Sequence, residues 1–161
     1  MTAYFIGKWN GTNLQQVNSR NLGARNAGRT FGKLAFFLTV IGDGGKGIVV
    51  VLLGRYLDVS EFALTVGILF VVLGHLYPFW LKFKGGKGIA TGIGALLAFS
   101  PILLLALIAG FIVSLPFTKS LTISMVIGFF TYSVYILVTG KFELLLLIVM
   151  LLLLTFKHRE N

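Results

Sequence analysis

The sequence predicts an all-α protein, a multi-pass bundle of transmembrane helices, and three observations support this class. Hydrophobic residues make up 57% of the 161 residues and charged residues only 12%, far from the balance of a water-soluble domain. The apolar residues gather in runs that approach the ~20 residues an α-helix needs to cross a bilayer. Short basic loops connect these runs, as expected between membrane helices.

We expect about six helices in a single membrane domain that covers 1–161. A brief apolar piece at 1–8 has the pattern of the end of a helix, and a polar loop follows at 9–30. Membrane spans fill 31–156, and a polar tail occupies 157–161. The expected apolar runs are Phe31–Leu57, Phe62–Leu81, Ile89–Phe99, Pro101–Leu115, Leu121–Val138 and Phe142–Phe156.

Two prolines divide the middle of the chain. Pro101 and Pro116 predict helix breaks, because proline lacks the N–H that an interior helix position donates. The run Ile89–Phe99 is too short to cross a ~30 Å hydrocarbon core at about 1.5 Å per residue. We therefore expect a half-span there, or one arm of a helix hairpin.

Charge bias predicts the orientation of the spans. When successive spans alternate in direction, most basic residues fall on one side, which the positive-inside rule makes cytoplasmic. Both termini then lie inside, and a site at the cytoplasmic face of the cell membrane is expected. The cytoplasmic set is Arg20, Arg25, Arg29, Lys33, Lys82, Lys84, Lys87, Lys119, Lys157 and Arg159. The opposite set is Arg55, Asp58, Glu61, Lys141 and Glu143.

Composition disfavours several kinds of site. The chain has no cysteine, which excludes disulfides and zinc–thiolate centres, and its two histidines are too few for a metal cluster built from histidine. We expect no metal and no cofactor. The net charge of +9 would suggest nucleic acid in a soluble protein, but here it lies in short loops between apolar runs, so no nucleic-acid partner is expected.

The polar segment Ser19–Arg29 is a candidate phosphate-binding loop. It combines a hydroxyl group, two amides, two glycines and three arginines, and guanidinium groups bind phosphate through paired hydrogen bonds. The alternative is a basic loop that only fixes topology or touches anionic lipid. The residues expected to contact phosphate are Asn21, Gly23, Arg25 and Asn26.

The string Gly-Gly-Lys-Gly occurs twice, at Gly44–Gly47 and Gly85–Gly88. The second copy precedes an apolar run, where backbone N–H groups and a helix N-terminus form a nest for an anion. It fails the Walker pattern, which disfavours ATP hydrolysis. The alternative is a flexible loop with close helix packing. The phosphate contacts expected here are Lys84, Gly85, Gly86, Lys87, Gly88 and Thr91.

Four ionisable residues complete the set of candidates. Asp43 and Lys46 lie three residues apart within an apolar run, which predicts a structural ion pair on one helical face. His75 is expected to be a hydrogen-bonded structural residue, with phosphate binding or proton transfer as the alternative. His158, beside two cationic residues at the last membrane exit, is the better candidate for a substrate contact.

The order of these motifs resembles the bacterial acyl-phosphate:glycerol-3-phosphate acyltransferase family of PlsY type. The pattern runs Ser-x-Asn-x-Gly-Ala-x-Asn-x-x-Arg, then Asp-x-x-Lys-Gly, then Gly-His-x-x-Pro and Lys-Gly-Gly-Lys-Gly-x-Ala-Thr, and finally His-Arg-x-Asn. In this chain it occupies Ser19–Arg29, Asp43–Gly47, Gly74–Thr91 and His158–Asn161.

The resemblance implies an integral membrane enzyme with seven helices. Such an enzyme moves a fatty acyl group from acyl phosphate to glycerol 3-phosphate and forms lysophosphatidate for phospholipid synthesis. It implies no cofactor, and the partners are the two substrates, membrane lipid and a candidate enzyme that produces acyl phosphate. The family pattern implies five catalytic residues, which are Ser19, Arg29, Lys87, His158 and Asn161.

This chain departs from the family pattern in three places. The first helix is reduced to about 1–8, Arg20 and Arg25 replace the usual Gly and Thr, and no basic extension follows Asn161. The alternative function is therefore a catalytically altered or inactive paralogue that binds lipid or acts as a membrane scaffold. A transporter is disfavoured because Leu144–Leu154 carries no polar side chain.

Overall fold

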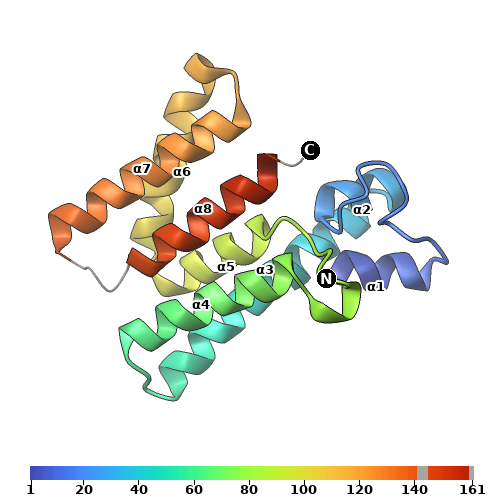
Figure 1. Cartoon of the computed structure of the whole chain (residues 1–161), viewed down its shortest axis with the longest axis horizontal. Coiled ribbons are helices and arrows are strands. Elements are labelled where there is room, and N and C mark those ends of the chain that lie inside the picture. Colours follow the sequence, from blue (N-terminus) through green and yellow to red (C-terminus); the bar gives the residue numbers. More distant parts are fainter. Residues whose placement is uncertain (141–144, 160–161) are drawn as a thin grey trace.

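The computed structural model describes residues 1–140 and 145–159, and the regular secondary structure of this part is all helical, without strands (Figure 1). The predicted all-α class is therefore confirmed. The helices are α1 (Thr2–Trp9), α2 (Ala24–Phe31), α3 (Lys33–Tyr56), α4 (Glu61–Leu76), α5 (Ile89–Phe99), α6 (Pro101–Thr118), α7 (Leu121–Thr139) and α8 (Leu145–Arg159), with the 3₁₀ turn η1 at Phe79–Leu81.

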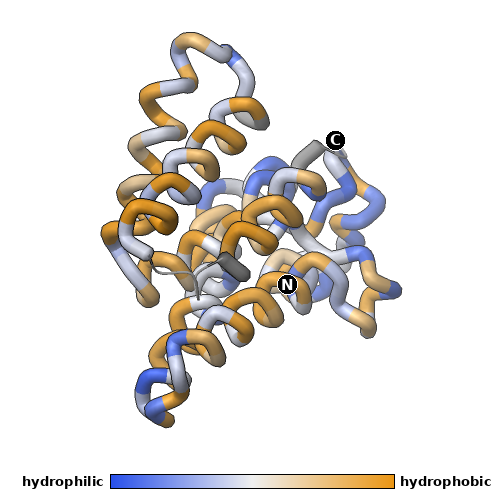
Figure 2. Tube along the Cα trace, turned by 60° about the vertical axis from the view of Figure 1, so that its left-hand side comes forward, coloured by the Kyte–Doolittle hydropathy of each residue, from blue (hydrophilic) through white to orange (hydrophobic). Residues whose placement is uncertain are grey.

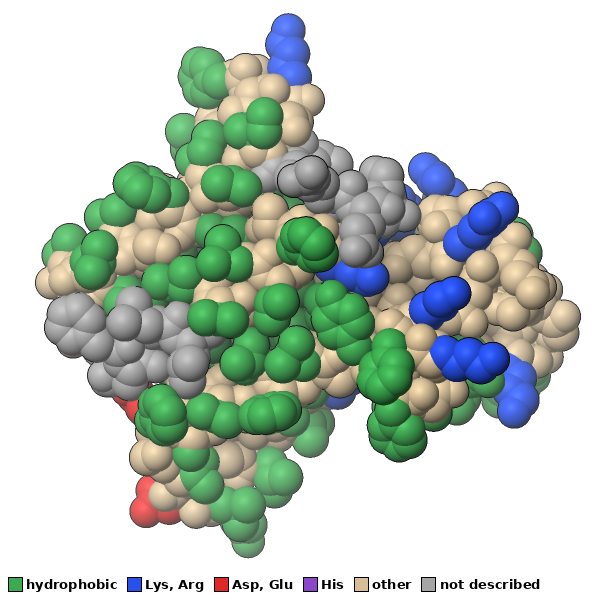
Figure 3. All heavy atoms as spheres, in the orientation of Figure 1, with side chains coloured by type: hydrophobic (Ala, Val, Ile, Leu, Met, Phe, Trp, Pro, Cys, Tyr) green, Lys and Arg blue, Asp and Glu red, His purple; other side chains and the backbone are tan. Residues whose placement is uncertain are grey.

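Six apolar segments account for the membrane-spanning part, close to the predicted runs. Three of them, Lys33–Tyr56, Glu61–Leu81 and Pro101–Thr118, are long and apolar enough to cross a bilayer. Three shorter apolar helical segments are Ile89–Phe99, Ile123–Thr139 and Leu147–Lys157. Figure 2 shows hydrophobic residues along these helices and hydrophilic ones at the turns. Many large apolar side chains lie exposed, as a hydrocarbon environment requires (Figure 3).

The two prolines behave differently. Pro101 begins α6 directly after α5 ends at Phe99, and the Ser100 hydroxyl accepts a hydrogen bond from the Leu103 N–H (3.5 Å). The predicted break at Pro101 is therefore confirmed. The predicted break at Pro116 is wrong, because α6 continues to Thr118. A proline this close to the helix end disturbs little of the helix that follows.

Glycines bring α3 and α5 into direct backbone contact. A Cβ on Gly47 would overlap the Thr91 carbonyl and the Ala95 backbone, and a Cβ on Gly94 would overlap the backbone of Gly44. The first Gly-Gly-Lys-Gly string thus serves close helix packing, as small residues do in membrane bundles. The main core joins α4, α5, α7 and α8 through Ile68, Val72, Leu96, Ile136 and Met150, among others.

Basic and acidic side chains lie at different ends of the helix bundle. The Arg55 guanidinium, at the end of α3, donates to the Phe99 carbonyl at the end of α5 (2.6 Å). Because α5 is the shorter helix, its start lies beside the middle of α3, where a Cβ on Gly44 would be 3.4 Å from the Ala90 carbonyl. Lysine and arginine side chains gather on the molecule's end that carries α1 and α2, while acidic side chains lie at the α3–α4 turn (Figures 1 and 3). Of the opposite set, Lys141 and Glu143 fall outside the described residues.

Candidate active site

A cavity of about 1070 Å³ opens between the polar loop, α2, α3 and the start of α5. Nine of the predicted site residues line it: Ser19, Asn21, Gly23, Arg25, Arg29, Asp43, His75, Lys87 and Gly88. They come from segments that are far apart in sequence. Its remaining walls are mostly apolar, including Phe36, Val40, Ile41, Ile93 and Leu97.

The side chain of Asn26 binds the backbone of the loop that contains Ser19. Its side chain is 1% exposed, and its amide nitrogen lies within hydrogen-bonding distance of the carbonyls of Leu14 (3.0 Å), Val17 (3.2 Å) and Asn21 (3.0 Å). These contacts favour a structural role over the predicted phosphate contact, because the amide donors are already used. Ser19, by contrast, is exposed and lines the cavity.

Three cations face the cavity from two sides. Arg25 and Arg29 are one turn apart on α2, and Lys87 lies opposite on the loop before α5. Burial, and after it the charge of Arg25, lowers the pKa of Lys87. Within the described residues, the Lys87 ammonium has no hydrogen-bonding partner, and Asp43, the acidic residue among those that line this cavity, is already paired. The excess positive charge favours an anionic ligand.

The second Gly-Gly-Lys-Gly string differs from the predicted nest. The Gly85 N–H donates to the Leu76 carbonyl (3.0 Å) and the Gly86 N–H to the His75 carbonyl (3.2 Å), so neither is available to an anion. The phosphate contacts predicted for these two glycines are therefore corrected to a packing role. Lys84 is exposed and does not line the cavity, and its carbonyl accepts from the Gln15 amide (2.9 Å).

The start of α5 supplies the donors that these glycines do not. Gly88, with φ +78°, precedes the helix, and it lines the cavity together with Ile89 and Ala90. The first N–H groups of an α-helix have no partner within the helix, and the helix dipole is positive at that end. An anion in the cavity would thus meet the α5 N-terminus and the Lys87 ammonium together.

A polar cluster lies at the inner end of the cavity. Asp43 and Lys46 form an ion pair (3.2 Å), and Asp43 also accepts from the Thr2 N–H and hydroxyl (both 3.2 Å) and from the Met1 nitrogen (2.7 Å). Lys46 Nζ lies 2.6 Å from His75 Nδ1. Thr91, predicted as a phosphate contact, is fully buried and lies instead 3.2 Å from the same ring nitrogen.

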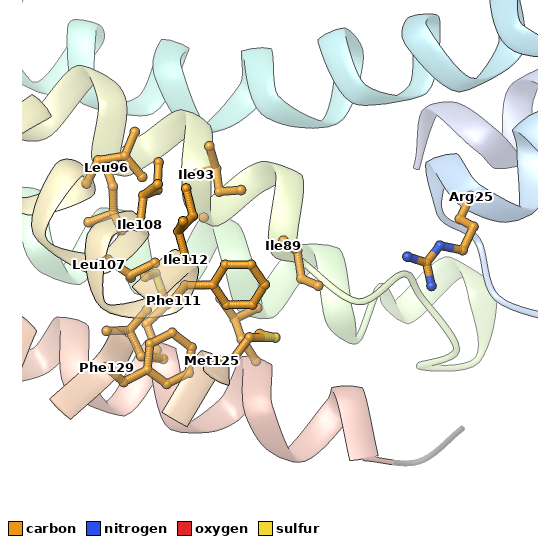
Figure 4. A pocket seen from close by; sticks show the side chains of 15 residues that line it. Arg25, Ile89, Ile93, Leu96, Leu107, Ile108, Phe111, Ile112, Met125 and Phe129 are labelled. Carbon is orange, nitrogen blue, oxygen red and sulfur yellow. The ribbon is translucent and has the colours of Figure 1, made fainter. Parts of the chain in front are cut away.

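A second, apolar cavity of about 440 Å³ adjoins the first (Figure 4). The two share Arg25, Ile89 and Ile93, and Figure 4 shows Arg25 on the far side of Ile89 from the other labelled side chains. Sequence reasoning missed this cavity, since its residues look like any other leucine-rich span. Its other lining residues are Gly92, Leu96, Leu104, Leu107, Ile108, Phe111, Ile112, Met125, Phe129, Met150, Leu151 and Leu154.

Two predicted catalytic residues cannot be placed at the site from the described part of the structure. The side chain of His158 is not among the described groups, and Asn161 lies outside the described residues. The described part of α8 nevertheless approaches the start of α5. A Cβ on Gly88 would clash with the Leu154 side chain, and a Cβ on Gly92 would lie 3.1 Å from it. The last turns of α8 therefore border the loop that carries Lys87 and the start of α5.

Comparison with known proteins identifies the family. The family model described as glycerol-3-phosphate acyltransferase matches residues 1–161. The chain belongs to the glycerol-3-phosphate acyltransferase family. The resemblance drawn from the motifs is thereby confirmed, and the protein is a multi-pass membrane protein of this family.

Relatives support the assignment along the whole chain. Glycerol-3-phosphate acyltransferase 1 of Bacillus cereus is 42% identical over 123 residues, which are 76% of this chain and 68% of that protein. The glycerol-3-phosphate acyltransferase of Geotalea daltonii is 33% identical over 162 residues, covering 99% of this chain and 84% of the relative.

Two solved structures are similar in fold. They are crystal structures of PlsY (YgiH), an integral membrane glycerol 3-phosphate acyltransferase, in its glycerol 3-phosphate form and its lysophosphatidic acid form. Their TM-scores are 0.81 and 0.80 at 29% identity. The first match covers 99% of this chain and 81% of that one, and the second 100% and 82%.

Proposed function

We propose that this protein transfers a fatty acyl group from acyl phosphate to glycerol 3-phosphate and releases lysophosphatidate and inorganic phosphate. The single observation that carries the proposal is the meeting of a cationic cavity with an apolar cavity at Arg25, Ile89 and Ile93. An acyl phosphate has the same two parts, an anionic head and a hydrocarbon tail. The two ligand-bound forms of PlsY, which is similar over nearly the whole chain, support the acceptor and product.

The polar cavity fits the phosphate groups of both substrates. Arg25 and Arg29 offer planar guanidinium groups, Lys87 offers a point charge, and the start of α5 offers N–H donors. The apolar cavity, reached past Arg25 and Ile89, suits the acyl tail. At about 440 Å³ it lies within the usual range for ligand pockets.

The chemistry we propose needs no acyl-enzyme. Among the described residues, Ser19 has no hydrogen-bonding partner and so no base beside it. A hydroxyl oxygen of glycerol 3-phosphate bonds to the acyl carbon while the bond from that carbon to the bridging phosphate oxygen breaks. The hydroxyl proton passes to a phosphate oxygen, and inorganic phosphate departs. The cations stabilise the negative charge on the departing phosphate.

The remaining site residues enter the proposal through the family pattern. Ser19 contributes a hydroxyl at the cavity wall. In the proposal His158, in the last turn of α8, and Asn161, two residues beyond that helix, contact glycerol 3-phosphate. The approach of Leu154 to Gly88 supports this placement of the tail. The whole of 1–161 then works as one catalytic domain.

We place the site at the cytoplasmic face of the cell membrane. Support comes from the basic side chains gathered around α1 and α2 together with the positive-inside rule (Figure 3). Glycerol 3-phosphate then enters from water and the acyl tail from the bilayer. A soluble enzyme that makes acyl phosphate is a candidate partner at this face.

The first experiment measures lysophosphatidate formation in membranes that contain this chain, with acyl phosphate or with acyl-CoA as the donor. We expect product from acyl phosphate only, and its loss in Lys87→Ala at equal membrane abundance. Lys33→Ala is the matched control, because Lys33 is an exposed lysine that does not line the cavity. Product from acyl-CoA, or an active Lys87→Ala, would contradict the proposal and favour an altered enzyme or a scaffold.

A further inference from the structure

We infer that His75 is a positioning residue that holds both ends of the loop carrying Lys87, one end through its backbone carbonyl and the other through ring atom Nδ1. The inference rests on the proposed function, because it assigns the loop its phosphate-binding task. His75 lies at the end of α4, one residue before the last residue of the helix, and its side chain is only 3% exposed.

The first anchor is made by the backbone. The His75 carbonyl accepts the Gly86 N–H (3.2 Å), and the neighbouring Leu76 carbonyl accepts the Gly85 N–H (3.0 Å). The His75 ring also packs against the loop, since a Cβ on Gly86 would overlap ring atom Nε2. The segment before Lys87 is therefore fixed to the end of α4.

The second anchor is made by the ring. Nδ1 lies 3.2 Å from the hydroxyl of Thr91, in the first turn of α5, just after Lys87. Thr91 is fully buried, so this contact is shielded from water. His75 thus touches the chain on both sides of Lys87, at Gly86 and at Thr91.

A third contact fixes the ring itself. Lys46 Nζ lies 2.6 Å from Nδ1, and an ammonium group has only donors, so Nδ1 must be the acceptor and carry no proton. The Thr91 hydroxyl, 3.2 Å away, makes the second and longer contact to the same lone pair. Lys46 is held in turn by Asp43 (3.2 Å), and Asp43 by Thr2. A continuous chain of polar contacts therefore links α1, α3, α4 and α5.

The two His75 anchors matter for catalysis because the segment between them carries groups of the proposed site. This segment contains Lys87, Gly88 and the first residues of α5, all of which line the cavity. Electrostatic catalysis depends on holding such groups within about 0.5 Å of the productive position. A ring that loses its Nδ1 contacts releases Thr91, and the α5 N-terminus and the neighbouring Lys87 ammonium move with it.

The test uses substitutions that keep one ring nitrogen position and lose the other. The amide oxygen of His75→Asn replaces Nδ1 as an acceptor, whereas the longer His75→Gln reaches toward Nε2, and His75→Ala keeps neither. We expect His75→Asn to retain kcat within a few-fold. We expect His75→Gln and His75→Ala to lose about 10- to 100-fold in kcat/KM, the usual cost of losing a contact that orients an active group.

Substitutions at Thr91 test the other partner of the contact between the His75 ring and the Thr91 hydroxyl. Thr91→Ser keeps the hydroxyl and should restore the rate that Thr91→Val loses. Thr39→Val is the matched control, because Thr39 is equally buried but, among the described residues, its hydroxyl bonds only to the Ala35 carbonyl of its own helix (2.7 Å). We expect Thr39→Val to keep wild-type kcat and KM.

A second measurement does not depend on turnover. The rise in melting temperature that glycerol 3-phosphate produces in each detergent-solubilised variant should follow the order wild type, His75→Asn, then His75→Gln and His75→Ala. Better retention in His75→Gln than in His75→Asn would overturn the inference in favour of direct substrate contact through Nε2. Equal behaviour of all three variants would also overturn it. An inactive wild type that still shows this order would contradict only the proposed function.

Discussion

Gly94 of α5 lies directly against Gly44 of α3, so closely that a Cβ on Gly94 would overlap the Gly44 backbone. The contact fixes the position of α5 along the axis of α3, and hence the position of the α5 N-terminus at the cavity. Side chains cannot substitute for it, because two backbones occupy the space. It is the structural reason for glycine at position 44, the first residue of the first Gly-Gly-Lys-Gly string.

Gly94→Ala should lower the free energy of unfolding by about 1–3 kcal/mol, the usual cost of overpacking a tight contact. Unfolding in detergent, followed by circular dichroism, measures this. Gly74→Ala is the control, because the same Cβ at Gly74 of α4 meets nothing within 4 Å. There the gain in helix propensity should leave stability unchanged or raise it by up to about 1 kcal/mol. Equal stability of the two variants would contradict the backbone contact.

Arg20→Gly should stabilise the protein. Arg20 has φ +54°, in the left-handed region that is unfavourable for residues with a Cβ, and the family pattern has glycine at this position. Relief of that strain is worth up to about 1 kcal/mol. Arg20 does not line the cavity, so KM for both substrates should stay constant. A rise in KM would show instead that the Arg20 side chain takes part in binding.

Arg25→Thr should raise KM for the anionic substrates and shift the alkaline limb of the pH profile upward. In the proposed reaction Lys87 binds phosphate as an ammonium, so activity is present below its pKa and lost as the pH rises through it. Burial and then Arg25 lower this pKa, and removing Arg25 lets it rise. The measurement is kcat/KM against pH for wild type and variant. An unchanged alkaline limb would mean that another group controls it.

The sequence was enough to predict which segments form the site. Ser19 and Arg29 stand far from Lys87 in the chain, yet the alternation of apolar runs and basic loops predicted that they share one face, and all three line one cavity. This succeeded because the bilayer forces each apolar run to cross and each basic loop to one side.

The roles of single polar residues within those segments were harder to predict. Asn26 and Gly86 belong to motifs that resemble phosphate-binding loops. In the structure, however, the Asn26 side chain binds backbone carbonyls of the polar loop, and Gly86 packs against His75. Composition shows that donors are present, whereas tertiary contacts decide which donors are already used. The apolar cavity gave no signal at all, because a lipid-facing leucine and a cavity-lining leucine look the same in a sequence.

The apolar cavity can be tested by filling it. Ile108→Trp places a large ring inside the cavity and should raise KM for palmitoyl phosphate at least about tenfold, since a long chain loses burial worth about 0.8 kcal/mol per methylene. Butyryl phosphate, whose short chain stays near Arg25 and Ile89, should be affected much less. Leu105→Trp is the control, because Leu105 lies on the same helix but is exposed and does not line the cavity. An equal effect of Ile108→Trp on both donors would place the acyl chain elsewhere, and the α3–α5 wall of the larger cavity would become the groove to test next.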